Sequence, residues 1–228
     1  WWNTPICFKK YDLDMDEDLA IIDTNTRNEK IKNFLLNNKR KIIIFLSLII
    51  IILLCYFGLN ELKKKQKLEI SNLYNSIIID YSKNQKKDVL KNLISVINKK
   101  DATYSPLSLY FIIDNDLLNE NDKINELFNI LIDETSLEKE IKNLIIYKKA
   151  LFNADYISEN ELLKILKPVI NSKSVWKAHS LYLVAEYFYS KNEMKKSKEF
   201  FDQILIVENP PQDILKETQK RLNRDFGE

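Results

Sequence analysis

Glycine is almost absent from this chain, with two residues in 228. Sharp β-turns and phosphate-cradling loops rely on glycine, because glycine alone adopts left-handed backbone angles at little steric cost. The shortage argues against a dinucleotide-binding fold and against a sheet-rich protein. We therefore expect an all-α fold.

Histidine and cysteine are equally scarce. The single histidine, His179, is the one residue around which a zinc site with nitrogen ligands or a Ser-His-Asp arrangement could be built. Of the two cysteines, Cys7 lies near the start of the chain and Cys55 lies inside an apolar run, so no disulfide framework is available to a folded domain. We expect no catalytic residue, no metal and no cofactor, and a domain that is held together by packing.

The chain also lacks a large excess of charge of either sign, since it has 35 Lys and Arg residues and 33 Asp and Glu residues. This balance gives no reason to expect a nucleic-acid partner. The acidic series at Asp12, Asp14, Asp16 and Asp18 is similar to the start of a calcium-binding loop, but Glu17 stands where such a loop needs glycine. We expect no calcium site there.

Long apolar runs, by contrast, are present in the stretch KRKIIIFLSLIIIILLCYFGLNELKKK. Its eighteen uncharged residues, Ile42 to Leu59, would form a helix about 27 Å long, close to the roughly 30 Å of a bilayer hydrocarbon core. A buried core helix would keep a polar edge, and a cleaved signal would be shorter and end in small residues. We expect an uncleaved membrane anchor over residues 42–59.

Basic residues flank this run on both sides. More of them precede it than follow it, and the positive-inside rule counts Lys and Arg near a span. The residues are Arg27, Lys30, Lys32, Lys39, Arg40 and Lys41 before the run, and Lys63, Lys64, Lys65 and Lys67 after it. The count predicts a cytoplasmic tail over residues 1–41 and a domain over residues 60–228 across the membrane. Because the sequence does not begin with Met, a natural translation start at Met15 is a separate hypothesis.

The region after the run repeats a helical pattern. Apolar residues recur at the spacing of one helix face in four successive pairs of segments, and the polar breaks within pairs, near Asn84, Glu120, Asp155 and Asn192, are about 36 residues apart. Ser105 before Pro106 and the combinations Thr135 with Glu138, Ser158 with Glu161 and Asn209 with Gln212 have the spacing of helix starts. A hairpin of this size cannot bury both faces alone, so we expect a stacked α-solenoid that ends in a helix near residues 212–224.

The fourth pair matches the tetratricopeptide pattern most closely. In that register, six residues are predicted to pack between the two helices, with small residues at positions 185 and 197 because the helices must approach closely there. They are Leu181, Val184, Ala185, Phe188, Ser197 and Phe201. The pattern departs at Ile204, where a small residue is usual, and at Asn209, where Pro is usual.

Four segments together resemble a known family: MDEDL at residues 15–19, the single apolar run, TYSPLSLYFIIDNDL in the second pair, and AEYFYSKNEMKKSKEFFDQIL in the fourth. The chain is similar to bacterial inner-membrane tetratricopeptide proteins of the ancillary SecYEG translocon subunit and cell-division coordinator type. The resemblance implies a cytoplasmic N-terminus, a periplasmic domain, and association with the translocon or with periplasmic chaperones.

The repeat register also predicts a partner-binding groove. It places His179, Tyr182, Glu186 and Tyr189 on the inner face of the fourth pair, where polar and aromatic side chains suit peptide contact. Two functions fit: an interaction scaffold that binds translocon, chaperone or exported client proteins, and an assembly factor in envelope biogenesis or cell division that bridges fixed membrane partners. Whether the span also binds a second copy of the chain is open.

Overall fold

The computed structural model describes the backbone of residues 15–83 and 88–227, and side chains from residue 26 onward within these ranges. The described residues form helices and no strand, which confirms the predicted all-α class. The predictions for Cys7, for the acidic series that starts at Asp12, and for the break at Asn84 fall outside the described residues or side chains. The chain separates into two compact units, residues 1–64 and 65–228, which are taken one at a time.

The first unit contains most of the long helix α1, Met15–Ser82. Within this helix, the large apolar side chains from Ile43 to Leu59 are 37–67% exposed. By length and composition, α1 is suited to cross a membrane or to act as a signal sequence, and it alone meets this description among the described residues. The thiol of Cys55 is free and exposed.

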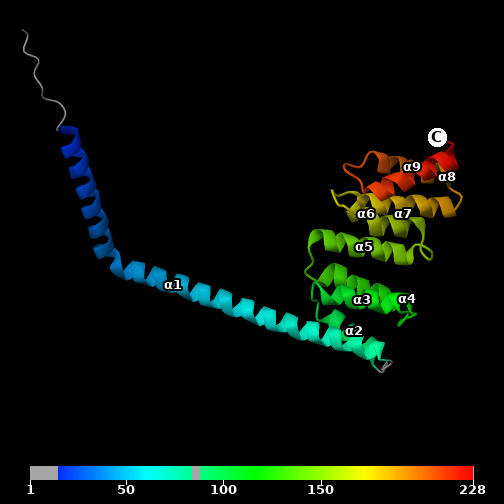
Figure 1. Cartoon of the computed structure of the whole chain (residues 1–228), viewed down its shortest axis with the longest axis horizontal. Coiled ribbons are helices and arrows are strands. Elements are labelled where there is room, and N and C mark those ends of the chain that lie inside the picture. Colours follow the sequence, from blue (N-terminus) through cyan, green and yellow to red (C-terminus); the bar gives the residue numbers. More distant parts are fainter. Residues whose placement is uncertain (1–14, 84–87, 228) are drawn as a thin grey trace, which may run out of the picture. The chain divides into compact units, whose positions relative to one another are not determined.

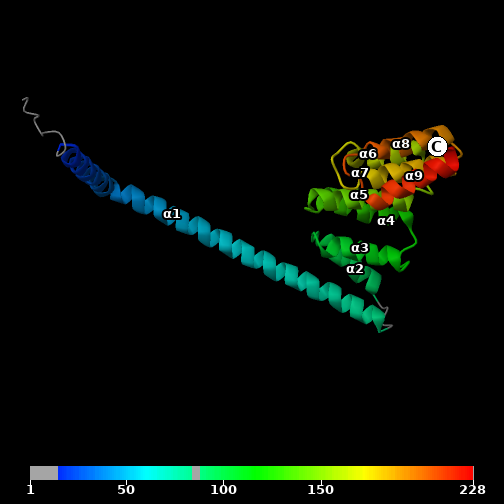
Figure 2. The ribbon, with the colours of Figure 1, turned by 45° about the horizontal axis from the view of Figure 1, so that its top comes forward.

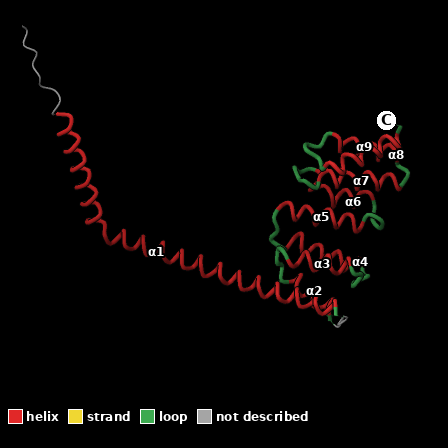
Figure 3. The backbone as a smooth tube through the Cα atoms, viewed as in Figure 1, coloured by secondary structure: helices red, strands yellow, loops and turns green. Residues whose placement is uncertain are grey.

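The second unit is a succession of short helices that follow the end of α1 (Figure 1, Figure 2). Figure 3 shows that short loops and turns separate them. The helices are α2 (Val89–Asn98), α3 (Tyr104–Asp114), α4 (Asn121–Asn129) with the π-helical turn η1 (Ile130–Glu134), α5 (Lys139–Asn153), α6 (Glu159–Ile170), α7 (Lys177–Ser190), α8 (Met194–Leu205) and α9 (Gln212–Phe226).

The end of α1 runs in the same direction as α3. The hydroxyl of Tyr104, the first residue of α3, donates to Oγ of Ser71 at 2.7 Å, and the rings of Tyr81 and Phe111 lie 5.1 Å apart near the other end of both helices. The residues that follow the apolar run therefore enter this unit at the edge where α3 begins.

Helices α5, α7 and α9 begin at this same edge. Glu140, in the first turn of α5, accepts hydrogen bonds from Ser174 Oγ at 2.7 Å and from Val175 N at 3.1 Å, just before α7. At the opposite edge the hydroxyl of Tyr187 donates to Ile157 O, beyond the end of α5. The loops that precede α5, α7 and α9 accordingly gather on one side of Figure 1.

The core follows the order of the helices. One buried cluster joins the end of α1 to α2, α3, α4 and η1, and includes Leu93, Leu109 and Phe128. A second joins α5, α6 and α7 around Leu162 and Leu166, and a third joins α7, α8 and α9 around Phe201. Each helix thus buries one apolar stripe against its neighbours in the chain, as the helical period of the sequence predicts.

A pair of amides joins α4 to α5. Asn125 Nδ2 donates to Asn153 Oδ1 at 2.8 Å, and Asn153 Nδ2 donates to Asn125 Oδ1 at 2.8 Å. Asn153 also donates to Lys149 O and is 4% exposed, so its buried amide is fully engaged. The pair aligns the middle of α4 with the end of α5.

One predicted helix start has the expected geometry. Ser158 caps α6 through its side-chain oxygen, which accepts from Glu161 N, while Glu161 accepts from Ser158 N at 3.0 Å. This reciprocal pair is a capping box. The break predicted near Asp155 falls just before it.

The other three predicted starts were wrong in detail. Helix α3 begins at Tyr104, because Asp101 Oδ1 accepts from the backbone amides of Thr103 and Tyr104, and Ser105 instead donates to Val96 O from inside the core. Thr135 donates to Ile130 O rather than capping α5. Asn209 has φ 51° and precedes α9 without a capping hydrogen bond.

Candidate partner-binding face

Helix α7 has a tightly packed apolar side. Ser197 Oγ on α8 donates to Ala185 O at 2.9 Å, so the backbone of α7 and the side chain of α8 are in direct contact. A small residue on each helix permits this approach, and the hydrogen bond satisfies the buried hydroxyl. The six residues predicted to pack here are all buried: Leu181, Val184, Ala185, Phe188, Ser197 and Phe201.

The residues of the predicted groove lie along the rest of α7. Their spacing of three or four residues places His179, Tyr182, Glu186 and Tyr189 on one stripe of the helix. All four are half-buried. Three of them contact α8 or α9, whereas His179 contacts α5 and the start of α7, so the stripe divides into two environments.

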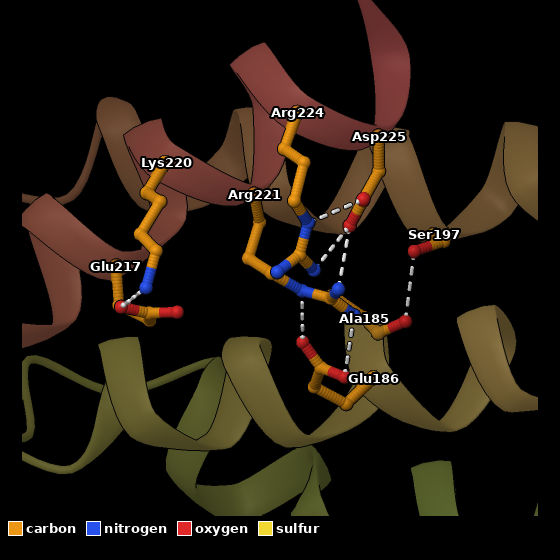
Figure 4. A network of polar contacts seen from close by, with 8 residues as sticks. All are labelled: Ala185, Glu186, Ser197, Glu217, Lys220, Arg221, Arg224 and Asp225. Atoms are coloured by element: carbon orange, nitrogen blue, oxygen red, sulfur yellow. Dashed lines mark hydrogen bonds and ion pairs between the residues drawn. The ribbon is translucent and has the colours of Figure 1, made fainter.

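Glu186 is the centre of the first environment (Figure 4). Its Oε1 accepts from Arg221 Nε at 2.7 Å and its Oε2 accepts from Arg221 Nη2 at 2.7 Å. A two-point contact between guanidinium and carboxylate fixes orientation as well as distance. The Arg221 side chain is 9% exposed and that of Glu186 is 35% exposed, so the bond binds α9 to α7 at the margin of the core.

Aromatic and acidic groups complete the surroundings of Arg221. Its guanidinium lies 4.2 Å from the centre of the Tyr189 ring, which suits a cation–π contact, and Tyr189 meets Phe226 edge to face. Arg221 also donates to Asp225, which is bound in turn by Arg224. Burial works against the charge of Arg221, but these acidic partners raise its pKa above the ordinary value.

Tyr182 borders the same network. Burial, together with the negative charge and hydrogen bond of Glu186, raises the pKa of Tyr182 to about 12. Its ring meets Phe201 edge to face at 5.4 Å. Tyr182 is thus a neutral phenol at physiological pH whose ring belongs to the α7–α8 core and whose hydroxyl reaches the charged network.

His179 occupies the second environment. Its ring lies 5.1 Å from that of Trp176 and 5.9 Å from that of Tyr147 on α5. Its Nδ1 is buried and has no hydrogen-bond partner among the described residues. An aromatic cluster of this kind packs α5 against α7, and it separates His179 from the Glu186 network.

The described surface of the second unit includes two hollows that bear on the site. The larger, about 480 Å³, lies where the loop before α7 meets the loop before α9, and is lined by residues 172–175, 177, 178 and 206–211. The smaller, about 180 Å³, lies between α3, α4 and α5 and is lined by Tyr110, Phe128 and Lys148 among others. Neither hollow contains a residue of the predicted groove.

Sequence reasoning missed the contribution of α9. It predicted a closing helix near residues 212–224 but assigned no role to Arg221, Asp225 or Phe226, which engage the groove residues. One signal was available, because Arg221 and Asp225 have the four-residue spacing at which opposite charges meet on a helix. The partner Glu186 is 35 residues away from Arg221, and no local pattern reveals that pairing.

The part of the chain that the structure describes contains no group of three or more His, Cys, Asp and Glu residues able to hold a metal ion. The absence of catalysis and of a cofactor stays a prediction. In comparisons with known proteins, no protein-family model, no curated protein and no solved structure matches this chain. The assignment of a function therefore rests on the sequence and on the geometry of the two units.

Proposed function

We propose that this chain is a membrane-anchored protein-interaction protein, with residues 42–59 as a single uncleaved span and residues 60–228 as a binding domain. One observation carries the proposal: the helix that contains the exposed apolar run ends in residues such as Leu73, Ile77 and Tyr81, which pack in the core of the second unit. A bilayer would cover the apolar run, and the domain would be tethered beside it.

The finer architecture is part of this proposal. Parallel α3, α5, α7 and α9, alternating with α2, α4, α6 and α8, support a stack of helical hairpins similar to tetratricopeptide repeats. The close contact between Ala185 and Ser197 also supports it, because the repeat pattern requires small residues there. These features support our proposal that the chain is akin to the inner-membrane tetratricopeptide proteins that it resembles, with translocon, chaperone or exported client proteins as partners.

The orientation is tested by protease protection in spheroplasts of a bacterial host, with a tag at the C-terminus and a probe before the span. The excess of Lys and Arg before residue 42 leads us to expect loss of the C-terminal tag and survival of the N-terminal probe. That result supports an inner-membrane protein with a periplasmic domain. Protection of the C-terminal tag would reverse the orientation and remove the periplasmic partners.

The partner class is tested by site-specific photo-crosslinking. A photoreactive residue at Tyr182 or Tyr189 reports on the predicted groove, and one at Tyr156, which is 72% exposed in the loop before α6, is the control. Capture of many exported proteins from positions 182 and 189 but not from position 156 supports a scaffold for clients. Tethering raises effective concentration, so weak affinity is sufficient for that role.

One observation favours the second function, an assembly factor that bridges fixed partners in envelope biogenesis or division. Glu186 and Tyr189 are already bound to Arg221 within the chain, which leaves fewer free groups for varied clients. A single stoichiometric crosslink would support this alternative. Equal capture from positions 156, 182 and 189 would contradict both versions of a groove on α7.

A further inference from the structure

The loop between α8 and α9 carries an unusually exposed apolar residue. Ile206 is 83% exposed, more than any other large apolar side chain in the described residues, those of the apolar run 42–59 included. Val175, in the loop before α7, is 62% exposed. Both line the hollow of about 480 Å³, together with Pro210 and Pro211, so two adjacent loops present one apolar surface. We call residues 172–177 and 206–211 the loop edge.

The direction of the helices places the loop edge on a particular side of the second unit. The end of α1 runs parallel to α3, and α5, α7 and α9 begin at the same edge as α3. The loop edge, which precedes α7 and α9, therefore lies on the side where the chain enters this unit from the apolar run. The opposite side carries the first residues of α2, α4, α6 and α8.

Chain length limits how far that side can be from a membrane. The apolar run ends at Leu59, and Ile70 already packs in the core of the second unit. Eleven helical residues extend about 16 Å. A span that ends at Leu59 therefore leaves the entry side of the domain a chain length short enough to reach the lipid headgroups.

Basic side chains lie next to the apolar residues of the loop edge. Lys173 and Lys177 flank Val175, while the acidic groups nearby are Glu208 of the same hollow and Glu140, whose carboxylate is engaged by Ser174 Oγ and Val175 N. Helices α7 and α9 also point their N-termini, which carry partial positive charge, toward this side. Apolar side chains with adjacent lysines are typical of segments that lie in the interface of a bilayer.

We propose that the loop edge docks on the lipid surface beside the anchor, with Ile206 and Val175 inserted among the headgroups. This inference rests on the proposed membrane span but not on the partner of the domain. It gives the domain a fixed face toward the bilayer and leaves the side that begins α2, α4, α6 and α8 directed away from it.

The test uses three single-tryptophan forms of the full chain in nanodiscs that contain brominated lipid, with Trp1, Trp2 and Trp176 replaced by Phe. Ile206→Trp reports on the loop edge, and Phe57→Trp reports on the span. Tyr156→Trp is the matched control, because Tyr156 is 72% exposed on the opposite side. We expect strong quenching at position 57 and quenching at position 206 that is several-fold greater than at position 156.

Other results distinguish the docking of the loop edge from the membrane anchor on which it rests. Strong quenching at position 57 with equal quenching at positions 206 and 156 overturns the docking but leaves the anchor intact. Unquenched fluorescence at position 57 overturns the anchor and the docking together. Far-ultraviolet circular dichroism of the three forms verifies that each remains helical.

A further variant tests whether the introduced tryptophan, rather than the natural loop, causes insertion into lipid. Val175→Asp, added to Ile206→Trp, puts a charge beside the probe without changing it. We expect quenching at position 206 to fall several-fold and quenching at position 156 of the matched Val175→Asp form to stay unchanged. Quenching at position 206 that is indifferent to Val175→Asp would overturn the proposal.

Discussion

The first helix pair of the domain, α2 and α3, and the last pair, α7 and α8, share one kind of packing contact and differ in the residues that surround it. At the first end, Ser105 Oγ donates to Val96 O at 3.0 Å between α3 and α2, and at the last end Ser197 Oγ donates to Ala185 O at 2.9 Å between α8 and α7. Both serines are fully buried, so each hydroxyl allows close approach while it remains hydrogen-bonded. The first end adds mainly apolar and aromatic contacts, with the Tyr104–Ser71 hydrogen bond and an exposed Lys100–Glu134 ion pair, whereas the last end adds the partly buried charged network around Arg221.

This difference indicates which conditions each end tolerates. Apolar packing depends little on pH and salt, whereas ion pairs at a partly exposed margin weaken when a partner is protonated or screened. We therefore expect α9 to loosen under conditions that leave α2 and α3 intact. The largest expected effect, loss of a core side chain, should be equal at the two ends, whereas the smaller effects should differ between them.

Removal of a core side chain should affect both ends alike. We expect Phe201→Ala to lower the free energy of unfolding by about 3–5 kcal/mol, and Leu93→Ala in the first cluster by about 2–5 kcal/mol, because each leaves a cavity in a fully buried site. Urea unfolding of the full chain in detergent, followed by circular dichroism, measures both. A loss below about 1 kcal/mol for either variant would contradict tight packing at that end.

Loss of the guanidinium should affect only the last end. Arg221→Met keeps much of the side-chain volume but removes the bonds to Glu186 and Asp225, and we expect it to destabilise the docking of α9 by about 1–3 kcal/mol because Glu186 is partly solvated. Hydrogen exchange should become faster in α9 and stay constant in α2. Lys220→Met, which removes an exposed charge on the same helix, is the control and should change neither.

The capping box of α6 lies between the two ends of the domain. Its loss measures how much a single helix start contributes to stability, for comparison with the effects at either end. Ser158→Ala should cost about 1 kcal/mol of stability through the lost cap. Glu161→Gln should cost less, because glutamine also completes a capping box. Urea unfolding compares the two variants, and an equal loss would show that the charge of Glu161, not its hydrogen bond, stabilises the start of α6.

Acidification should weaken the packing of α9 at a higher pH than it weakens the packing of α2. The hydrogen bond from Arg224, followed by the charge of Arg221, holds the pKa of Asp225 below its ordinary value. A carboxyl with a lowered pKa stabilises the folded state above its unfolded pKa of about 3.9, and this contribution disappears as the pH falls through the folded pKa. We expect exchange in α9, corrected for the intrinsic rate, to rise below about pH 4 in the natural chain.

The matched variant for this pH dependence is Asp225→Asn. It lacks the titrating group, so its α9 should exchange faster at neutral pH and show a weaker change on acidification. An identical acid response in the two proteins would assign the effect to another carboxylate.

The sequence predicted the packing positions of the last pair of helices and a closing helix near residues 212–224, but not the contacts that this helix makes with α7. Alternation of apolar and small residues with a helical period identifies Val184, Ala185 and Ser197 as packing positions, since periodicity is a local property. The pairing of Glu186 with Arg221 depends on how α9 returns across α7, which no local pattern contains. Capping showed the same limit, because Asp101 caps α3 from a position that the Ser-Pro pattern does not include.

The amide pair between Asn125 and Asn153 has a mechanical consequence. Under the proposed anchoring and binding, a pulling force passes through the helices of the domain in series and reaches α4 and α5, near the boundary of the first and second core clusters. Two antiparallel amide hydrogen bonds of 2.8 Å must break together when these helices slide past each other. The pair thus resists sliding of α4 against α5 midway along the domain. A single Asn→Leu replacement at either position should lower the force at which the helices up to α4 separate from those that begin with α5.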